Sequence, residues 1–356
     1  MPGGVDDMTA PSGGNSYDRR VCQGLPGTGW QVHEHAIAGG WPQPGAAART
    51  ELARLLARLP DGAVVLIDGL LACAVPDVVV PEAGRLRLVV LVHLPLGDET
   101  GLDPALAADL DARERETLRA VPAVVATSGW AARRLVDHHG LDPHLVHVAE
   151  PGVERAPLAA GTDGVSRLLC VASVTPRKAQ HRLVEALATV ADLPWSCAIV
   201  GSLHQDPDYT AGLRALIAGF GLGDRFSLPG PQSGAELAAS YAAADLAVLT
   251  SRAETYGMVV TEALARGIPV LATAVDGLPE AVGRAPDGSV PGILVPPEDP
   301  LALNSALRRW FSEPGVRSRS RESARRRRAM LRGWEMTSRS LAEVLEQLRR
   351  ETRRTA

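Results

Sequence analysis

The chain has 356 residues, of which 46% are hydrophobic and 22% are charged, and its formal net charge at pH 7 is -4. This length favours two domains, the composition is typical of a soluble globular protein, and the slightly acidic balance gives no reason to expect nucleic acid as a partner. No uninterrupted apolar run reaches the roughly 18 residues that a membrane-spanning helix needs.

The four cysteines lie far apart in the sequence and form no CxxC pair. A disulfide framework or a zinc site is therefore not expected, and a reducing, cytoplasmic location fits. The first residues do not combine a basic segment with an apolar one, so they do not have the pattern of a signal peptide.

The first half of the chain alternates short apolar runs with longer helical patterns. Continuous apolar character is typical of buried strands in a parallel sheet. It predicts strands at 62–69, 86–95, 123–128 and 145–152. Helical periodicity is found between strands or before them, at 46–60 and 103–121.

Residues 11–15, with the sequence Pro-Ser-Gly-Gly-Asn, are typical of a glycine-rich turn between a strand and a helix. Residues 1–10 are too polar to form the buried strand that should come before such a turn. We therefore hypothesise that the true start lies upstream of Met1, and that the first strand of the domain is missing from this sequence.

The same pattern restarts after a linker-like stretch that follows residue 153. Strands are predicted at 167–173, 196–202, 225–230, 246–251, 268–274 and 292–297, and the tail is helical and basic. Two such series predict an α/β fold of two doubly wound, Rossmann-like domains with a ligand-binding cleft between them. The predicted division is 1–154, 155–333 and a C-terminal helix, 334–356, that packs back toward the first domain.

The segment 252–273 combines features that suit a nucleotide-sugar. Glu254 and Glu262 are eight residues apart, and Gly257 lies between them where a helix is expected to begin. Eight helical residues rise about 12 Å, which could reach along such a ligand, and a helix amino terminus favours phosphate. The alternative is an ordinary amphipathic helix with solvated glutamates, and the spacing alone does not decide between them.

A second cluster of charge follows the first predicted strand of the second domain. Arg177 precedes Lys178, which is the one lysine among 37 basic side chains. Two cations at a strand end could neutralise a diphosphate and stabilise the charge that develops on it as it leaves. The alternative is a solvated turn.

Over nearly its whole length the chain resembles the retaining family 4 glycosyltransferases, a group that includes glycogen synthase-like and phosphatidylinositol mannosyltransferase-like enzymes and has the GT-B architecture. The ordered set of motifs carries this resemblance: PSGGN, VVATSGWAARRL, VHVAEPGVE, VASVTPRKAQHRLVEAL, AIVGS, SLPGPQSG, RAETYGMVVTEALARGIPVLAT and GILVPPEDPLAL.

The resemblance implies roles for residues of the second domain. Arg177 and Lys178 are similar to the pair that holds the donor diphosphate. Glu254 matches the glutamate that faces the hydroxyls of the transferred sugar, and Glu262 matches the one that accepts from the nucleotide ribose. The backbone that binds sugar and phosphate oxygens would be that of Tyr256, Gly257, Met258 and Val259. Tyr256 departs from the phenylalanine that usually stands there.

In the first domain the resemblance implies three residues. Gly13 and Gly14 are similar to the loop that closes on the phosphate. His93, at the end of the predicted strand 86–95, is similar to a histidine often found near the sugar ring. The residue by itself has a second reading as a structural histidine, but an imidazole at a cleft can also serve as a proton carrier.

No metal site is expected. His138, His139, His144 and His147 show no metal-binding spacing and are interpreted as surface and linker residues. Asp109 and Asp111 form a DxD pair inside a charged helical pattern, where a solvated face is expected. Asp206 and Asp208 lie in a predicted loop and are no more strongly indicated as metal ligands. The arginine run 325–328 is interpreted as a solvated helix face, so neither RNA nor a membrane surface is expected.

The sequence therefore predicts a metal-independent retaining hexosyltransferase without cofactor. It would move a sugar from a nucleotide-sugar donor to an unidentified small-molecule or glycan acceptor, expected to be soluble. Two alternatives stay open: another GT-B enzyme, such as a sugar-nucleotide epimerase or a phosphorylase, and a non-catalytic module that binds a nucleotide-sugar.

Overall fold

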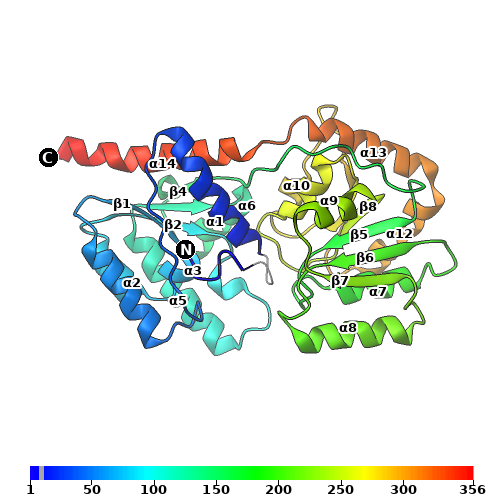
Figure 1. Cartoon of the computed structure of the whole chain (residues 1–356), viewed down its shortest axis with the longest axis horizontal. Coiled ribbons are helices and arrows are strands. Elements are labelled where there is room, and N and C mark those ends of the chain that lie inside the picture. Colours follow the sequence, from blue (N-terminus) through cyan, green and yellow to red (C-terminus); the bar gives the residue numbers. More distant parts are fainter. Residues whose placement is uncertain (8–11, 356) are drawn as a thin grey trace. The chain divides into compact units, whose positions relative to one another are not determined.

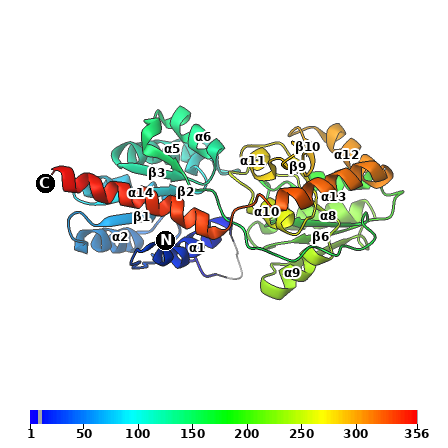
Figure 2. The same cartoon turned by 90° about the horizontal axis from the view of Figure 1, so that it is seen from above.

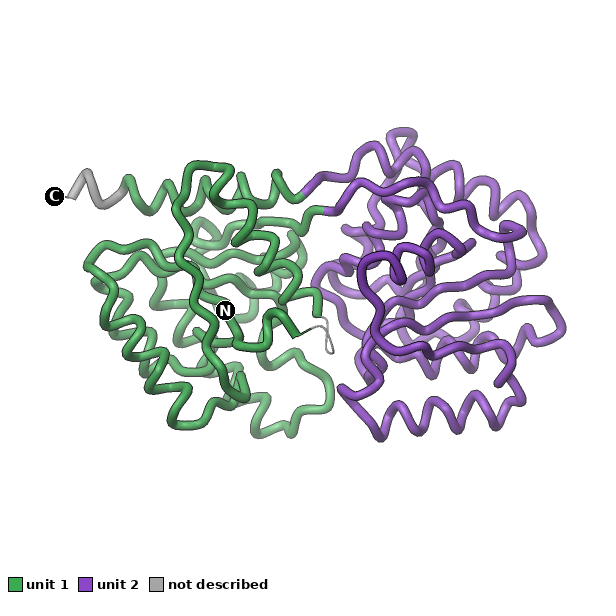
Figure 3. Tube along the Cα trace, in the orientation of Figure 1, with its two compact units in different colours: residues 1–7, 12–152, 334–356 green, residues 8–11, 153–333 purple. Residues whose placement is uncertain are grey.

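The structure is a computed structural model that describes residues 1–7 and 12–355, with side chains through Arg350. The chain splits into two compact units (Figure 3). Unit 1 contains residues 1–7, 12–152 and the last helix from Trp334, and unit 2 contains residues 153–333. The division predicted from the sequence placed the first boundary after residue 154.

Unit 1 is built on a four-stranded parallel sheet with the order β1-β2-β3-β4 (Figure 1). Its strands are β1 (Val64–Asp68), β2 (Arg87–Val92), β3 (Ala123–Ala126) and β4 (Val146–Val148). These confirm the four strands predicted in this half. In the described residues no strand precedes the first helix, so β1 has a hydrogen-bonded neighbour on one side, β2.

Helices cover both faces of this sheet because its strands are apolar on both faces. One face packs against α2, α5 and α6 in a core that includes Leu88, Val90 and Val124. The other face packs Val89, Leu91 and Val125 against α1 and α14, and Figure 2 shows α14 running across β1 and β2. The helices are α1 (Gly13–Gly24), α2 (Ala46–Arg58), α3 (Gly69–Ala72), α4 (Pro76–Val79), α5 (Pro104–Ala120), α6 (Gly129–His139) and α14 (Trp334–Thr355).

Unit 2 is built on a six-stranded parallel sheet with the order β10-β9-β8-β5-β6-β7. Its strands are β5 (Arg167–Val171), β6 (Ser196–Val200), β7 (Phe226–Gly230), β8 (Leu246–Leu249), β9 (Val270–Thr273) and β10 (Gly292–Val295). All six confirm the prediction. The chain moves outward from β5 to β7 on one side and from β8 to β10 on the other, so the order reverses between β5 and β8.

Two helical layers enclose the sheet of unit 2. One core contains Trp310, which is fully buried and donates through Nε1 to the Val165 carbonyl at 3.0 Å; the helices of this layer are α7 (Gln180–Ala188), α8 (Pro207–Gly219) and α12 (Pro300–Ser312). The other core packs α9 (Gly234–Ala242), α10 (Met258–Ala265), α11 (Leu278–Val282) and α13 (Pro314–Arg328) against the opposite face.

The arginine run at the end of α13 does more than solvate a helix face, which corrects the prediction. Arg328 donates to the carbonyls of Ala265 at 2.7 Å and Ala156 at 2.6 Å, and Arg327 donates to that of Val282 at 3.1 Å. These two guanidinium groups therefore tie α13 to the backbone of unit 2. Among the described helices none is both long and apolar enough to cross a bilayer.

Candidate active site

The reversal of strand order in unit 2 marks where a ligand is expected. In doubly wound sheets the loops that leave the carboxyl ends of the two strands at the reversal diverge and create a crevice. Here these are the loops after β5 and β8, residues 172–179 and 250–257. They are tied to each other, because Arg252 N–H donates to the Arg177 carbonyl at 2.8 Å and Thr250 Oγ1 donates to the Ala179 carbonyl at 3.0 Å.

Three predicted residues meet at this point: Lys178, Arg177 and Glu254. The Lys178 ammonium contacts Glu254 Oε1 directly. Arg177 Nη1 lies 3.8 Å from Glu254 Oε2 and donates to the Ala253 carbonyl at 3.2 Å. Ser251, which the sequence analysis did not single out, donates its hydroxyl to Glu254 Oε1 at 3.1 Å. The two cations and one carboxylate therefore form one cluster at the crevice.

The charge state of Glu254 follows from its surroundings. Only 6% of the residue is exposed. Burial raises the pKa of the Glu254 carboxyl, but the Lys178 ammonium and then the Arg177 guanidinium outweigh burial and hold the pKa below its ordinary value. Glu254 is thus a buried carboxylate that stays ionised because two cations face it.

The backbone around Glu254 is held in uncommon conformations. Glu254 N–H donates to Asp276 Oδ2 at 2.9 Å, and Asp276 itself has φ of 49°. Ala179, directly after Lys178, also has φ of 49°. Non-glycine residues rarely adopt left-handed values, and such strain is concentrated at functional sites.

Helix α10 begins at Met258, after Gly257 with φ of 91°. The left-handed conformation favours glycine, and a Cβ on Gly257 would lie 2.4 Å from Leu278 Cδ2, so any larger residue would have to displace that side chain. Glu254 precedes the helix, as the predicted helix start at Gly257 requires, so the rise of eight helical residues does not describe its separation from Glu262. Tyr256 is buried, and the N–H groups of Met258 and Val259 are the first of α10.

Glu262 lies inside α10 and is half-buried. Tyr241 donates its hydroxyl to Glu262 Oε2 at 2.8 Å, and the Arg266 guanidinium lies 4.4 Å from the centre of the Tyr241 ring. Burial, followed by the Glu262 charge, raises the pKa of Tyr241, so the phenol stays protonated and donates. One Glu262 oxygen is thus fixed in position by a buried donor.

A second group of predicted residues comes together in unit 1. His93 follows β2, and its Nε2 lies 2.8 Å from Asp18 Oδ1 and 4.0 Å from Asp68 Oδ2. Gly14 lies against the same ring, since a Cβ at this position would be 3.2 Å from His93 Cδ2. Gly13 and Gly14 are the first two residues of α1, capped by Ser12, and not part of a loop, which corrects the expected local structure.

The carboxylates control the charge of His93. Burial lowers the pKa of the His93 imidazole, but Asp18 and then Asp68 outweigh it, so the pKa is raised above its usual value. Burial raises the pKa of Asp68 to about 6, with the His93 charge opposing and the Asp18 charge adding to that shift. Asp18 Oδ2 is buried and has no hydrogen-bond partner.

Two of the clustered histidines and three of the acidic residues contact other protein groups, with one correction to the prediction. His139, predicted to lie at the surface, is buried, and its Nε2 lies 3.0 Å from Glu114 Oε2. Asp111 contacts both His138 and Arg115, and Asp109 pairs with an arginine of the same helix. Asp206 caps α8 by accepting from the Tyr209 N–H at 2.9 Å.

Two clusters in the described residues bring ligand atoms within 4.8 Å of one another: Asp18, Asp68 and His93, and Asp111, His138 and His139. In both, the imidazoles already contact carboxylates.

Sequence reasoning missed the partners that orient the predicted side chains. They are Asp18, Asp68, Tyr241, Ser251 and Asp276. Asp68 and Ser251 carried a local signal, because each stands at the carboxyl end of a predicted strand, where ligands gather. The others reach their partners through tertiary contacts.

Residues 162–327 match the protein family described as glycosyl transferases, group 1. The D-inositol 3-phosphate glycosyltransferase of Kineococcus radiotolerans is 34% identical over 257 residues, covering 65% of this chain and 58% of that protein. The protein of the same description from Geodermatophilus obscurus is 36% identical over 252 residues, covering 64% and 53%. The chain thus spans less than three fifths of the length of these relatives.

Solved structures with the same fold cover almost the whole chain. Sucrose-phosphate synthase from Thermosynechococcus elongatus superposes with a TM-score of 0.77 at 21% identity and covers 97% of this chain and 96% of its own. Anabaena Alr3699/HepE in complex with UDP-glucose gives a TM-score of 0.69 at 20% identity, with 88% and 85% covered. The predicted α/β GT-B fold is confirmed.

Proposed function

We propose that the chain transfers a sugar from a nucleotide-sugar to an acceptor hydroxyl, in keeping with the match of residues 162–327 to the glycosyl transferases group 1 family. The observation that carries the proposal is the cluster of Lys178, Arg177 and Glu254 at the reversal of strand order in unit 2. Cations at this point suit a leaving diphosphate, and a buried carboxylate beside them suits the hydroxyls of a sugar.

Binding of the donor would rearrange this cluster. A diphosphate carries more negative charge than Glu254 and would compete with it for the Lys178 ammonium. Arg177 is close enough to bind the diphosphate as well. Glu254 would then accept hydrogen bonds from sugar hydroxyls. The first N–H groups of α10, those of Met258 and Val259, add positive potential at the phosphate. Glu262, fixed by Tyr241, would accept from the ribose.

The reaction we propose proceeds with retention of configuration. The bond between the sugar C1 and the diphosphate oxygen breaks, and the acceptor oxygen forms its bond to C1 on the same face. The proton of the acceptor passes to the departing phosphate oxygen. Lys178 and Arg177 stabilise the developing negative charge, which is where an enzyme gains most of its rate. We expect His93, whose pKa Asp18 raises, to hydrogen-bond a sugar oxygen.

The donor we propose to test first is a UDP-sugar, since Anabaena Alr3699/HepE is described in complex with UDP-glucose. The acceptor would be a small polyhydroxyl compound such as an inositol phosphate, in keeping with the relatives' description. Two side-chain cations beside the diphosphate make transfer metal-independent, so activity should persist in EDTA. Four free cysteines, three of them buried, suit a reducing cytoplasmic location.

The single lysine gives a direct test of donor binding. Acetic anhydride can acetylate only two amines in this chain, Lys178 Nζ and the Met1 α-amine. A nucleotide-sugar bound at Lys178 should slow acetylation of Nζ and leave that of Met1 unchanged, as followed by mass spectrometry of peptides. If no member of a panel of UDP-, GDP- and ADP-sugars protects Lys178, the proposed donor site is wrong.

Turnover separates an enzyme from a binding module. Donor hydrolysis without acceptor should be lost in Glu254→Gln, while protection of Lys178 by the donor persists. Protection without any hydrolysis or transfer in the unaltered chain would contradict the proposal of an enzyme. Product anomeric configuration, read by NMR, tests retention.

A further inference from the structure

A histidine and two carboxylates form a cluster at the carboxyl edge of the unit 1 sheet. Asp68 is the last residue of β1, His93 follows β2, and Asp18 belongs to α1. Their ligand atoms lie within 4.8 Å of one another. Since ligands of parallel α/β sheets bind outside the carboxyl ends of the strands, the cluster stands where unit 1 would contact a substrate.

Protein groups surround most of the His93 ring. Nε2 lies 2.8 Å from Asp18 Oδ1 and 4.0 Å from Asp68 Oδ2. A Cβ on Gly14 would be 3.2 Å from Cδ2, and the Tyr17 ring packs at 74° to the imidazole with the ring centres 5.2 Å apart. Nδ1 lies on the opposite edge of the ring and has no hydrogen-bond partner among the described residues. Because 18% of the side chain is exposed, Nδ1 is the ring nitrogen that is left for a ligand.

The two carboxylates determine where the ring carries its protons. An ionised carboxylate accepts hydrogen bonds and cannot donate, so the contact with Asp18 requires a proton on Nε2. Asp18 Oδ2 is buried without a hydrogen-bond partner, and the ion pair that Asp18 makes in the described part of the chain is with His93. Asp68 is held in place because its Oδ1 accepts from the Leu70 N–H at 2.6 Å.

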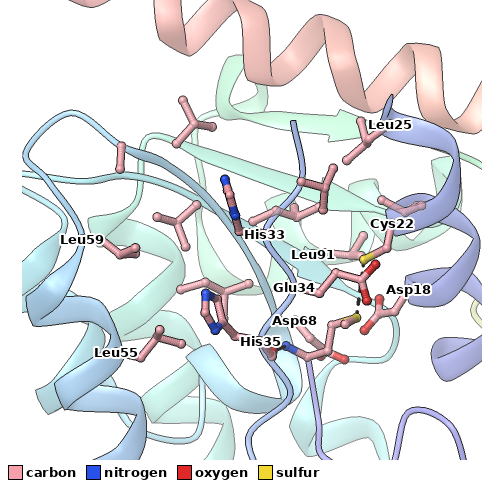
Figure 4. A pocket seen from close by; sticks show the side chains of 18 of the residues that line it. Asp18, Cys22, Leu25, His33, Glu34, His35, Leu55, Leu59, Asp68 and Leu91 are labelled. Carbon is pink, nitrogen blue, oxygen red and sulfur yellow. Dashed lines mark hydrogen bonds between the residues drawn. The ribbon is translucent and has the colours of Figure 1, made fainter. Parts of the chain in front are cut away.

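The cluster lies against apolar walls, which strengthen these interactions. Asp18 and Asp68 lie at one end of a pocket of about 460 Å³ whose walls include Leu55, Leu59 and Leu91 (Figure 4). The two acidic residues are only 4% and 7% exposed. Charges that little water surrounds interact more strongly than charges at the surface. The position of the carboxylates therefore has a large effect on the imidazole.

The other titratable groups around Asp18 do not offset its charge. Burial raises the pKa of the Tyr17 hydroxyl, and it raises the pKa of the Cys22 thiol to about 11, so both groups are neutral near pH 7. Glu34 lies at the same end of the pocket and forms an ion pair with Arg19. The imidazole is thus the group that offsets the two carboxylates.

We propose that Asp18 and Asp68 are positioning residues for His93, which hold its Nε2–H, keep both ring nitrogens protonated and leave Nδ1–H to donate to a sugar oxygen. This inference rests on the proposed function. Asp18 makes the close contact and sets the orientation of the ring, while Asp68 adds negative charge from 4.0 Å. Without Asp18 the ring would lose its charge at a lower pH, and Nδ1 would then be an acceptor.

The first part of the experiment needs no substrate. Long-range ¹H–¹⁵N spectra of the full chain with labelled histidine distinguish rings with one proton from rings with two, and His93→Gln identifies the resonances. At pH 6.5, about the ordinary pKa of histidine, most His93 rings should carry two protons, whereas in Asp18→Asn most should carry one. Asp68→Asn should act in the same direction but less. His181, whose Nδ1 lies 2.8 Å from the Tyr209 hydroxyl in unit 2, is the internal reference.

The second part uses the nucleotide-sugar, from the panel of UDP-, GDP- and ADP-sugars, that protects Lys178 best, and the same nucleoside diphosphate without sugar. In calorimetry at pH 6.5, Asp18→Asn should weaken binding of the nucleotide-sugar about tenfold and leave that of the diphosphate unchanged. The pH above which kcat/KM for donor hydrolysis falls should be about one unit lower. Asp77→Asn, which removes an exposed charge paired with Arg49, is the matched control and should change neither. In a His93→Gln chain, Asp18→Asn should have no further effect.

The outcomes separate this inference from the proposed function. A His93 ring with one proton at pH 6.5 in the unaltered chain, or a protonation unchanged by Asp18→Asn, would overturn the inference without reference to the reaction. Equal losses of affinity for the diphosphate and the nucleotide-sugar in Asp18→Asn would also overturn it, and the proposed function would stand. If no nucleotide-sugar protects Lys178, the proposed function is wrong, and the contact of Nδ1 with a sugar is refuted with it.

Discussion

The contact between Lys178 and Glu254 should be measurable as a coupling free energy in unit 2. We consider Lys178→Met, Glu254→Gln and the double variant, each unfolded with urea while fluorescence is recorded. Both side chains are mostly enclosed, with 17% and 8% of their surfaces exposed. Removing one partner of a buried ion pair leaves an uncompensated charge, which costs about 3–5 kcal/mol.

The double variant should behave differently from either single one. It removes both charges together, and its free energy of unfolding should lie within about 1 kcal/mol of the unaltered chain. The coupling free energy between the two side chains should therefore be several kcal/mol. In Lys178→Met, Arg177 remains 3.8 Å from the Glu254 carboxylate and should reduce the loss of stability.

The pH dependence of the free energy of unfolding gives an independent check, because it should have opposite signs in the unaltered chain and in Lys178→Met. In the unaltered chain the pKa of Glu254 is lowered by folding, so its contribution to stability is present above the unfolded pKa of about 4.3 and is lost as pH falls through the folded value. In Lys178→Met, burial dominates and the folded pKa should exceed the unfolded one. Stability of this variant, relative to the double variant, should then fall as pH rises from 4 to 7.

The matched control is Arg309→Met, which removes an exposed ion pair with Glu313 whose side chains are about half exposed. It should cost less than about 1 kcal/mol. A coupling energy between Lys178 and Glu254 no larger than in this exposed pair, together with unchanged pH dependence in Lys178→Met, would refute the buried cluster.

Three further variants test the oriented side chains. Asp18→Asn removes the charge nearest His93, so the imidazole pKa should fall, as measured by NMR titration; an unchanged value would contradict the pairing. Gly14→Ala should push the His93 ring aside by a few tenths of an ångström and change stability by less than about 1 kcal/mol, since alanine favours a helix, while the His93 resonances shift. Tyr241→Phe should weaken donor binding about fivefold through the loss of one hydrogen bond to Glu262, measured by calorimetry.

Each control variant changes a residue of the same type that does not make the tested contact. Gly27→Ala adds a methyl group where no atom lies within 4 Å, and it should leave the His93 resonances unchanged. Tyr209→Phe removes a hydroxyl that contacts His181 instead of Glu262, and it should not change donor affinity. Equal effects in test and control variants would show that the predicted contacts are not responsible.

The strands could be predicted from the sequence because both sheets are buried on both faces, which leaves continuous apolar runs such as 86–95 and 246–251. The reversal of strand order could not, because pairing of β5 with β8 is a choice between distant segments that no local pattern records. That pairing brings Lys178 to Glu254 across 76 positions of sequence.

The errors in the prediction have a common physical origin. The arginine run 325–328 is predicted to be a solvated helix face, but Arg327 and Arg328 donate to backbone carbonyls of other segments of unit 2. Likewise His139 is predicted among surface and linker residues because the histidine spacing matches no metal site, although Glu114 gives it a buried partner. Each error concerns a residue whose environment is set by a tertiary partner.

The same partners explain why position 178 carries a lysine in a chain that otherwise uses arginine. Lys178 precedes Ala179, which is fully buried and has a left-handed backbone conformation. An ammonium needs one acceptor and can rotate to a second, whereas a guanidinium fork needs two acceptors in one plane. Glu254 already accepts from Ser251 and faces Arg177. Under the proposed function, a compact charge that passes from the Glu254 carboxylate to a donor phosphate would suit this site better than a second guanidinium.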